Sequence, residues 1–180
     1  MKSLCVCVGC LLCLASVISC SDELLVRENS DRAAIVFDNL QTKALITDAD
    51  QISEFGVIGQ MNLGAEGEDK ADEYIILLDD EKVSWTDVSA SWTYENTCYW
   101  APDRAYHFFA VWPYSEENTS VTNVTPYATG GAYGYSVTFS TPENADQELL
   151  TAKKTESTAG NSIPASVDFQ FEHQLTNVNF

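Results

Sequence analysis

The sequence predicts an all-β fold, an antiparallel β-sandwich, on three observations. Short apolar and aromatic runs recur along the chain after its N-terminal segment, and several of them alternate with polar residues. Clusters of Gly, Pro, Asn and Asp separate these runs. Beyond the N-terminal segment, no apolar pattern of useful length follows the period of about 3.6 residues that marks a helix. Many short strands joined by turns are typical of a β-sandwich.

The N-terminal segment, residues 1–19, is predicted to be a lipoprotein signal peptide that is removed before Cys20. Lys2 gives it a positive start, and the apolar run Leu4–Ile18 is shorter than the roughly 20 residues that span a bilayer. Val17–Cys20 resembles a bacterial lipobox, which ends at the cysteine that is acylated. Two or more acyl chains, palmitate among them, anchor a protein stably, whereas one chain binds only marginally. An uncleaved signal anchor and cleavage without a lipid are the alternatives.

Two segments follow the signal peptide. Residues 20–32 are polar, and we interpret them as a tether from the membrane that carries Arg27 and Arg32. Residues 33–180 contain the predicted strands and form the domain. The residues before Phe180 still have a strand pattern, so we expect the domain to be incomplete at its C-terminal end.

The predicted strands follow one another in chain order, with turn residues between them. Apolar runs predict strands over 33–37, 44–47, 55–59, 74–78, 83–94 and 106–112. Strict alternation predicts two more strands, each with one buried face, over 135–139 and 167–172. Polar or Gly-rich composition predicts loops over 62–72, 115–125, 128–134 and 155–162.

The composition excludes some classes of function. The chain has 27 acidic residues, nine lysines and arginines, and a net charge of −18, which becomes −19 when Lys2 leaves with the signal peptide. Such a chain repels phosphate backbones, so we expect no nucleic-acid partner. Strong negative charge suits an exposed surface, where copies repel one another and stay soluble.

Candidate catalytic and metal-ligating residues are few. His107 and His173 are the only histidines, and the spacing gives neither of them the partner that general acid–base catalysis requires. The acidic runs 66–72 and 79–81 have no EF-hand pattern, and we interpret them as solvated loops. Cys98 is expected to be a buried thiol rather than a nucleophile. We therefore expect no enzyme, no bound metal and no cofactor.

Aromatic residues form two sets. Tyr127, Tyr133 and Tyr135 lie in or beside a Gly-rich segment, and they are candidate residues for stacking on a sugar ring. We interpret the tryptophans instead as core residues of the sandwich: Trp85, Trp92, Trp100 and Trp112.

Four segments in a fixed order resemble the fimbrillin-like (Mfa-like) family of surface lipoproteins from Bacteroidota. The first runs from Lys43 through the sequence ISEFGV, and the second has the pattern WTY…YW.P over 92–102. The third has the pattern Y.FFA..P over 106–113, and the fourth joins DQELLTA at 146–152 to F.H.L at 171–175. Each motif is degenerate alone, but the ordered set behind a lipobox is fairly specific. The resemblance covers residues 33–180.

The resemblance implies a transthyretin-like β-sandwich followed by a second sandwich domain, so that this chain is the N-terminal domain. It implies a non-enzymatic lipoprotein on the surface of the outer membrane, acting as a fimbrial structural or accessory subunit in adhesion. In shaft subunits a protease removes an N-terminal strand, and a strand of another subunit, identical or paralogous, fills the vacated groove. Arg27 and Arg32 are the candidate processing sites, and ordinary tether arginines are the alternative.

A second class of function stays open beside the fimbrial one. A surface glycan-binding lipoprotein of a nutrient-uptake system would have the same anchor and a β-sandwich. Exposed, coplanar aromatic rings in the segment with Tyr127, Tyr133 and Tyr135 would favour it, and wholly buried rings would count against it.

Overall fold

The computed structural model describes residues 32–42, 52–64, 72–115, 120–129, 132–140 and 148–174. The chain divides into two compact units, Met1–Asp31 and Arg32–Phe180, and every described residue belongs to the second unit. Cys20, Arg27 and the strand predicted over 44–47 therefore lie outside the described residues.

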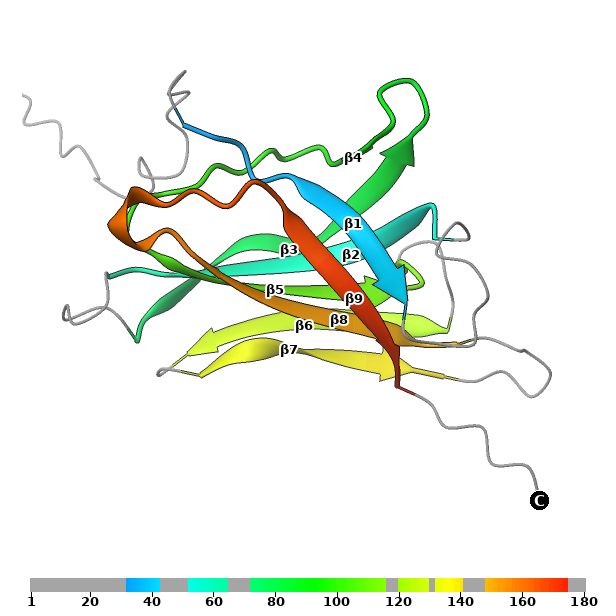
Figure 1. The fold of residues 1–180 in the computed structure, drawn as a ribbon. Helices are drawn as coiled ribbons and strands as arrows, with labels where there is room; N and C mark the ends of the chain where they lie inside the picture. Colours follow the sequence, from blue (N-terminus) through cyan, green and yellow to red (C-terminus); the bar gives the residue numbers. More distant parts are fainter. Residues whose placement is uncertain are drawn as a thin grey trace, which may run out of the picture. The chain divides into compact units, whose positions relative to one another are not determined.

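The second unit is built from strands, as predicted, and Figure 1 shows their arrangement. The strands are β1 (Phe37–Thr42), β2 (Glu54–Asn62), β3 (Tyr74–Thr86), β4 (Ser91–Thr93), β5 (Ala105–Trp112), β6 (Val121–Thr129), β7 (Ala132–Phe139), β8 (Leu150–Ser157) and β9 (Val167–His173). Among the described residues, seven strands form one sheet in the order β1-β9-β8-β5-β2-β3-β4. Strands β6 and β7 form a separate hairpin. Neighbouring strands pair antiparallel except β1 and β9, which are parallel.

The large sheet curls until the chain before β1 meets the chain after β4. Ala34 forms an antiparallel bridge with Tyr99, and the Ile35 amide donates to the Cys98 carbonyl at 2.9 Å. The Tyr94 hydroxyl donates to the Ile35 carbonyl at 2.8 Å. These bonds close one end of the curled sheet into a sandwich with a barrel-like section.

Aromatic side chains fill the space inside the curl. Phe37 on β1 is stacked on Phe169 of β9, with ring centroids 5.8 Å apart. The Phe37 ring also lies edge-to-face with Phe55 of β2 and Phe108 of β5, at centroid distances of 6.5 Å and 6.1 Å. These rings come from strands far apart in the sequence, and their burial supplies much of the free energy that holds the curl closed.

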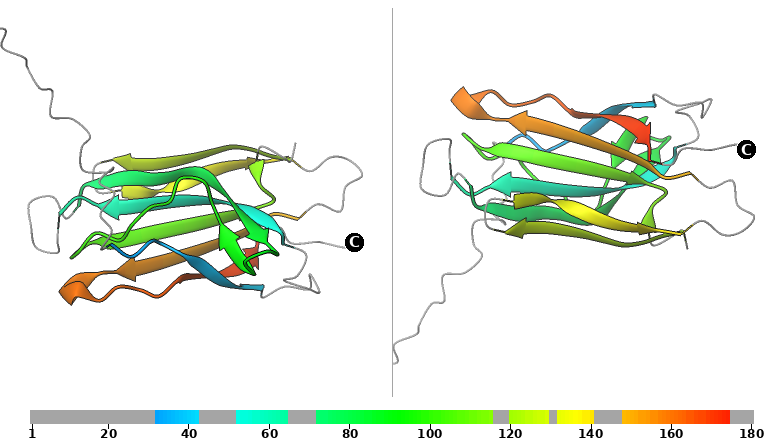
Figure 2. Two further views of the ribbon diagram at one scale, coloured as in Figure 1. Left: turned by 90° about the horizontal axis from the view of Figure 1, so that it is seen from above. Right: turned by 90° about the horizontal axis from the view of Figure 1, so that it is seen from below.

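The β6–β7 hairpin covers the outer face of the central strands, as Figure 2 shows from two sides. It explains why the residues of β2 after Glu54 are buried on both faces. Gln60, completely buried on β2, donates from Nε2 to the carbonyls of Tyr127 at 2.7 Å and Gly134 at 3.1 Å. A small apolar cluster around Val111, Val121 and Leu149 packs beneath the same hairpin.

Several predicted loops are strands. Residues 121–125 and 128–129 belong to β6 and residues 132–134 to β7, so the Gly- and Tyr-rich segment is a hairpin. The run 155–157 continues β8.

The acidic run 79–81 lies inside β3 rather than in a solvated loop. Glu81 accepts hydrogen bonds from the amides of Glu95 and Asn96, each at 3.1 Å, and so shapes the turn after β4. Asp80, at a positive φ of 51°, accepts a hydrogen bond from the Ser115 hydroxyl. The carboxylates therefore organise neighbouring turns.

The prediction that all the tryptophans are core residues is wrong in part. Trp100 is buried and packs against Tyr106 with centroids 4.7 Å apart. Trp92 and Trp112 are partly buried against the core. Trp85 is 42% exposed and lies on β3, opposite Trp92 of the edge strand β4.

Candidate functional site

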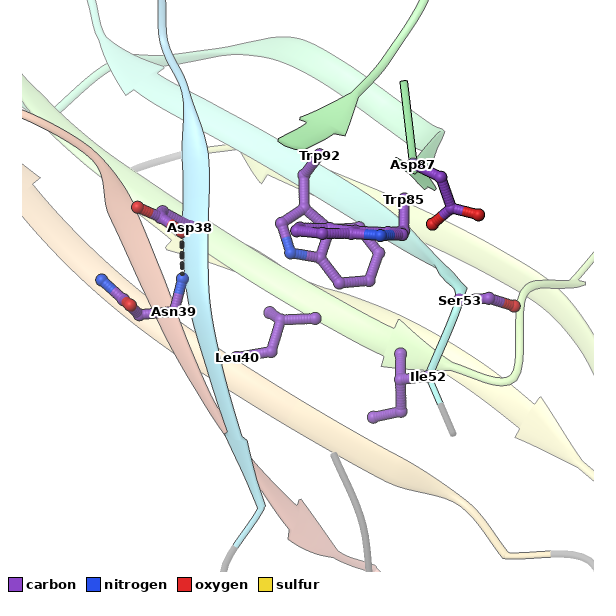
Figure 3. Close-up of a pocket in the computed structure, with 8 residues that line it drawn as sticks. All are labelled: Asp38, Asn39, Leu40, Ile52, Ser53, Trp85, Asp87 and Trp92. Atoms are coloured by element: carbon purple, nitrogen blue, oxygen red, sulfur yellow. Dashed lines mark hydrogen bonds between the residues drawn. The ribbon is translucent and has the colours of Figure 1, made fainter. Parts of the chain in front are cut away.

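A groove lies between β1 and the β3–β4 hairpin, at the two free edges of the large sheet (Figure 3). It has a volume of about 560 Å³. We call it the edge groove, and its lining residues are Asp38, Asn39, Leu40, Ile52, Ser53, Trp85, Asp87 and Trp92.

Two tryptophans form one wall of the edge groove. Trp85 and Trp92 are directly opposite each other in the β3–β4 pairing, and their ring centroids are 5.4 Å apart in an edge-to-face arrangement. Trp92 also packs on Phe55 at 5.0 Å, which fixes the pair against the core. Figure 3 shows Leu40 and Ile52 facing this wall. The groove therefore has an apolar centre formed by residues from four separate segments.

Polar groups border this apolar centre, and the strands beside it are sheet edges. Figure 3 shows Asp38 and Asn39 at one side and Ser53 and Asp87 at the other. The Asn39 amide donates to Asp38 Oδ1 at 2.8 Å, and Asn39 has a positive φ of 42° within an irregular part of β1.

In the described sheet, β1 pairs only with β9 and β4 only with β3. Each strand therefore has one edge free to accept main-chain hydrogen bonds.

A second hollow lies where the β6–β7 hairpin meets β5 and β8, with a volume of about 420 Å³. It brings together all three tyrosines that the sequence singled out. We call it the tyrosine pocket, and its lining residues are His107, Phe109, Tyr127, Tyr133, Gly134, Tyr135, Lys153, Lys154 and Thr155.

Aromatic contacts fix the inner wall of the tyrosine pocket. Tyr133 stacks on His107 with centroids 3.7 Å apart, and Tyr135 packs on Phe109 at 5.1 Å. Tyr127 is 49% exposed and lies across Gly134, where an added Cβ would come within 2.5 Å of its hydroxyl oxygen. Two of the three tyrosines are thus anchored against the sheet, while Tyr127 is held on the outside of the hairpin.

A comparison with the sequence models of protein families identifies the family of this chain. The sequence model of the fimbrillin-like family matches residues 42–180, well over half of the chain. The chain belongs to the fimbrillin-like family. Comparisons with curated proteins and with solved structures gave no significant match.

Membership in the fimbrillin-like family indicates a structural role as a fimbrial subunit. It also indicates a surface or fimbrial location and other fimbrial subunits as partners. The resemblance found in the sequence motifs is thereby confirmed.

The two histidines of the fimbrillin-like chain have different surroundings. His107 is buried on β5, and its Nδ1 lies 3.2 Å from Thr155 Oγ1. His173 Nδ1 lies 3.4 Å from Glu148 Oε2, and the ring is half-buried. Neither histidine is near a serine or cysteine nucleophile in the contacts that the described residues make, so neither belongs to a catalytic triad there.

Cys98 is a half-buried free thiol, less buried than expected. Its sulfur lies 3.6 Å from the Leu77 carbonyl oxygen. Burial, with the nearby Glu81 carboxylate, raises the pKa of Cys98 to about 11, so the thiol stays protonated and is a poor nucleophile at neutral pH.

Two further findings concern metals and membranes. Within the described ranges, no three His, Cys, Asp or Glu side chains gather as metal ligands. The same ranges contain no helix with the length and apolarity of a membrane span.

Of the predicted tether and processing residues, only Arg32 is described, and it is exposed just before the segment that pairs with Tyr99.

Sequence reasoning found the tyrosines but missed the edge groove. Leu40, Ile52, Trp85 and Trp92 become neighbours only when the sheet curls. The one local signal was Trp85 and Trp92 on either side of a turn, which a hairpin pairs across its two strands.

Proposed function

We propose that this fimbrillin-like chain is a fimbrial structural or accessory subunit that serves adhesion and accepts a strand of another subunit in the edge groove. A lipid on Cys20 would hold it at the outer membrane after removal of residues 1–19. The single observation that carries strand addition is the apolar groove between two free sheet edges in a member of a fimbrial family.

The chemistry of the edge groove suits an extended peptide from another subunit. A strand laid along β1 or β4 would form main-chain hydrogen bonds with the free edge, which supply affinity without demanding a sequence. Its alternate side chains would enter the space between Trp85, Leu40 and Ile52 and bury apolar surface there. Such pairing also removes an exposed edge that otherwise invites aggregation.

Processing at the candidate arginines would leave β1 in place. Arg27 and Arg32 both precede β1 in the sequence. Phe37 of β1 is 1% exposed and contacts rings on β2, β5 and β9, so loss of β1 would open the core. We therefore infer that the incoming strand enters beside β1 and does not replace it.

Strand addition is tested with substitutions that put a charge into the groove. Full-length Trp85→Glu and Leu40→Glu should reduce the assembled fraction of the subunit in surface material, as measured by native electrophoresis. Val88→Glu is the matched control, since Val88 is 98% exposed in the turn between β3 and β4. Assembly of the groove variants at the wild-type level, with the folded state verified by circular dichroism, would refute strand addition in the edge groove.

The anchor is tested separately by mass spectrometry of the intact protein from the membrane fraction. Wild-type protein should lack residues 1–19 and carry a lipid-sized mass, and Cys20→Ala should lose that mass. The same spectrum reports cleavage after Arg27 or Arg32. An unlipidated wild-type chain would remove Cys20 from the proposal and leave the family assignment intact.

A further inference from the structure

We propose that the tyrosine pocket binds a pyranose sugar that carries a single carboxylate, as sialic acid and uronic acids do. The proposal stands apart from subunit assembly, because the tyrosine pocket and the edge groove share no lining residue.

The first argument is the local charge. The whole chain carries a net charge of −18, yet none of the residues that line the tyrosine pocket is acidic, and Lys153 lies among them. A lysine can hold a carboxylate through a charge-assisted hydrogen bond. The surrounding negative charge repels polyanions most strongly, so a ligand with one negative charge fits better than a polyphosphate.

Strand geometry selects Lys153 as the residue that meets the carboxylate. Lys153 is directly opposite Phe109 in the β5–β8 pairing, so both side chains stand on the face that the hairpin covers. Lys154 is opposite Phe108, a core residue, and therefore projects from the other face. Lys154 also pairs with Glu156 at 3.2 Å, whereas the described residues offer Lys153 no ion-pair partner.

The second argument is the aromatic wall. Sugar rings present C–H faces that pack on aromatic rings, while their hydroxyls need polar partners nearby. Tyr135 and Phe109 give an apolar wall beside Lys153, and the polar residues Tyr127 and Thr155 line the same pocket. A pocket of about 420 Å³ lies within the size range of small-molecule sites.

The pocket is held in shape before any ligand arrives. Gln60 fixes the hairpin through two hydrogen bonds at the Tyr127–Gly134 pair, and the Tyr133–His107 stack holds the neighbouring pair. Gly134 leaves the room that Tyr127 needs to lie across the strand. A wall that is already ordered does not pay conformational entropy on binding, which favours affinity.

The test uses the full chain in mild detergent, with binding measured by saturation-transfer NMR and calorimetry. The probes are 3′-sialyllactose, methyl glucuronide and neutral lactose. At least one acidic probe should bind at least about tenfold more tightly than lactose. The acidic probe that binds more tightly shows whether the pocket prefers a sialic acid or a uronic acid. Failure of both acids to bind at concentrations up to about 10 mM would overturn the proposal, as would equal binding of lactose.

Two matched pairs of variants locate the site. Lys153→Gln and Tyr127→Ala should each weaken the acidic sugar about tenfold. Lys82→Gln removes the same charge from a lysine that does not line the pocket, and Tyr99→Ala removes a tyrosine that is 43% exposed elsewhere. Both controls should stay within about twofold of wild type. Equal losses within either pair would show that the sugar binds outside the tyrosine pocket, and unfolding curves of all four variants establish that each is folded.

Discussion

At the scale of single residues, Gln60 connects the two sheets. Its side chain is completely buried, and its Nε2 donates to two carbonyls of the hairpin, one on β6 and one on β7. Two carbonyl acceptors require the amide nitrogen, so the geometry assigns the orientation of the amide. The described residues provide no partner for Gln60 Oε1, so its burial carries a free-energy cost that the two donated bonds offset.

We expect Gln60→Leu to lower the free energy of unfolding by about 1–3 kcal/mol, because two buried carbonyls lose their donor while one unpaired oxygen is removed. Urea denaturation followed by tryptophan fluorescence measures the change. Gln41→Leu, at an exposed position of β1, is the control and should stay within about 0.5 kcal/mol of wild type. Equal stability of Gln60→Leu and wild type would show that the hairpin does not depend on these bonds.

His107 makes a second prediction at this scale. Burial lowers its pKa below the ordinary value of 6.5, so at pH values just under 6.5 the unfolded chain binds a proton that the folded chain does not. The unfolding free energy therefore falls as pH drops through this window, and the full contribution is present above it. His107→Asn, which keeps a polar atom near Thr155, should reduce the slope of unfolding free energy against pH between about 7 and 5. Identical slopes for the two proteins would contradict this assignment.

At the scale of elements, the success of sequence reasoning depended on which face of each strand is buried. Strands β5 and β9 were predicted because apolar runs or strict alternation mark their buried residues. The first half of β6 was missed, since Thr122, Asn123 and Thr125 are exposed and only Val121 and Val124 face the sheet.

The separation of the lining residues in the sequence explains which site could be predicted. Tyr127, Tyr133 and Tyr135 are close in sequence, so a local pattern could bring them together, although residues 128–134 of their hairpin were predicted to be a loop. The edge groove depends on contacts between β1, β3 and β4 that only the curled sheet creates. Long-range pairing of this kind leaves no mark in local composition.

Strand β1 supplies an element-scale prediction, because Phe37 is its one fully buried residue. Phe37→Ala removes a ring in contact with Phe55, Phe108 and Phe169 and should cost about 3–5 kcal/mol of unfolding free energy. The neighbouring Val36 is 43% exposed, so Val36→Ala should change stability by less than about 1 kcal/mol. Chemical denaturation compares the two variants, and similar losses would show that β1 is not anchored through Phe37.

At the scale of the whole molecule, net charge opposes the assembly that we propose for the edge groove. Each copy carries a net charge of −18, so two copies of the chain repel each other before any strand can pair. The carboxylates of Asp38 and Asp87 at the groove would attract a donor segment only if that segment were basic. The long-range electrostatic repulsion should dominate between identical copies, because all the charges of both surfaces contribute to it.

Self-association of the full chain should therefore strengthen when salt is added. Raising NaCl from about 10 mM to about 150 mM shortens the screening length from roughly 30 Å to roughly 8 Å, which removes most of the repulsion between exposed charges. Sedimentation velocity should show a larger associated fraction at the higher salt concentration, and Trp85→Glu should abolish the gain while Val88→Glu retains it. These two variants add the same charge, so a difference between them reports on the groove and not on net charge. Association that weakens with salt would instead mean that the contact depends on attraction between acidic and basic groups, contrary to an apolar groove joined by main-chain bonds.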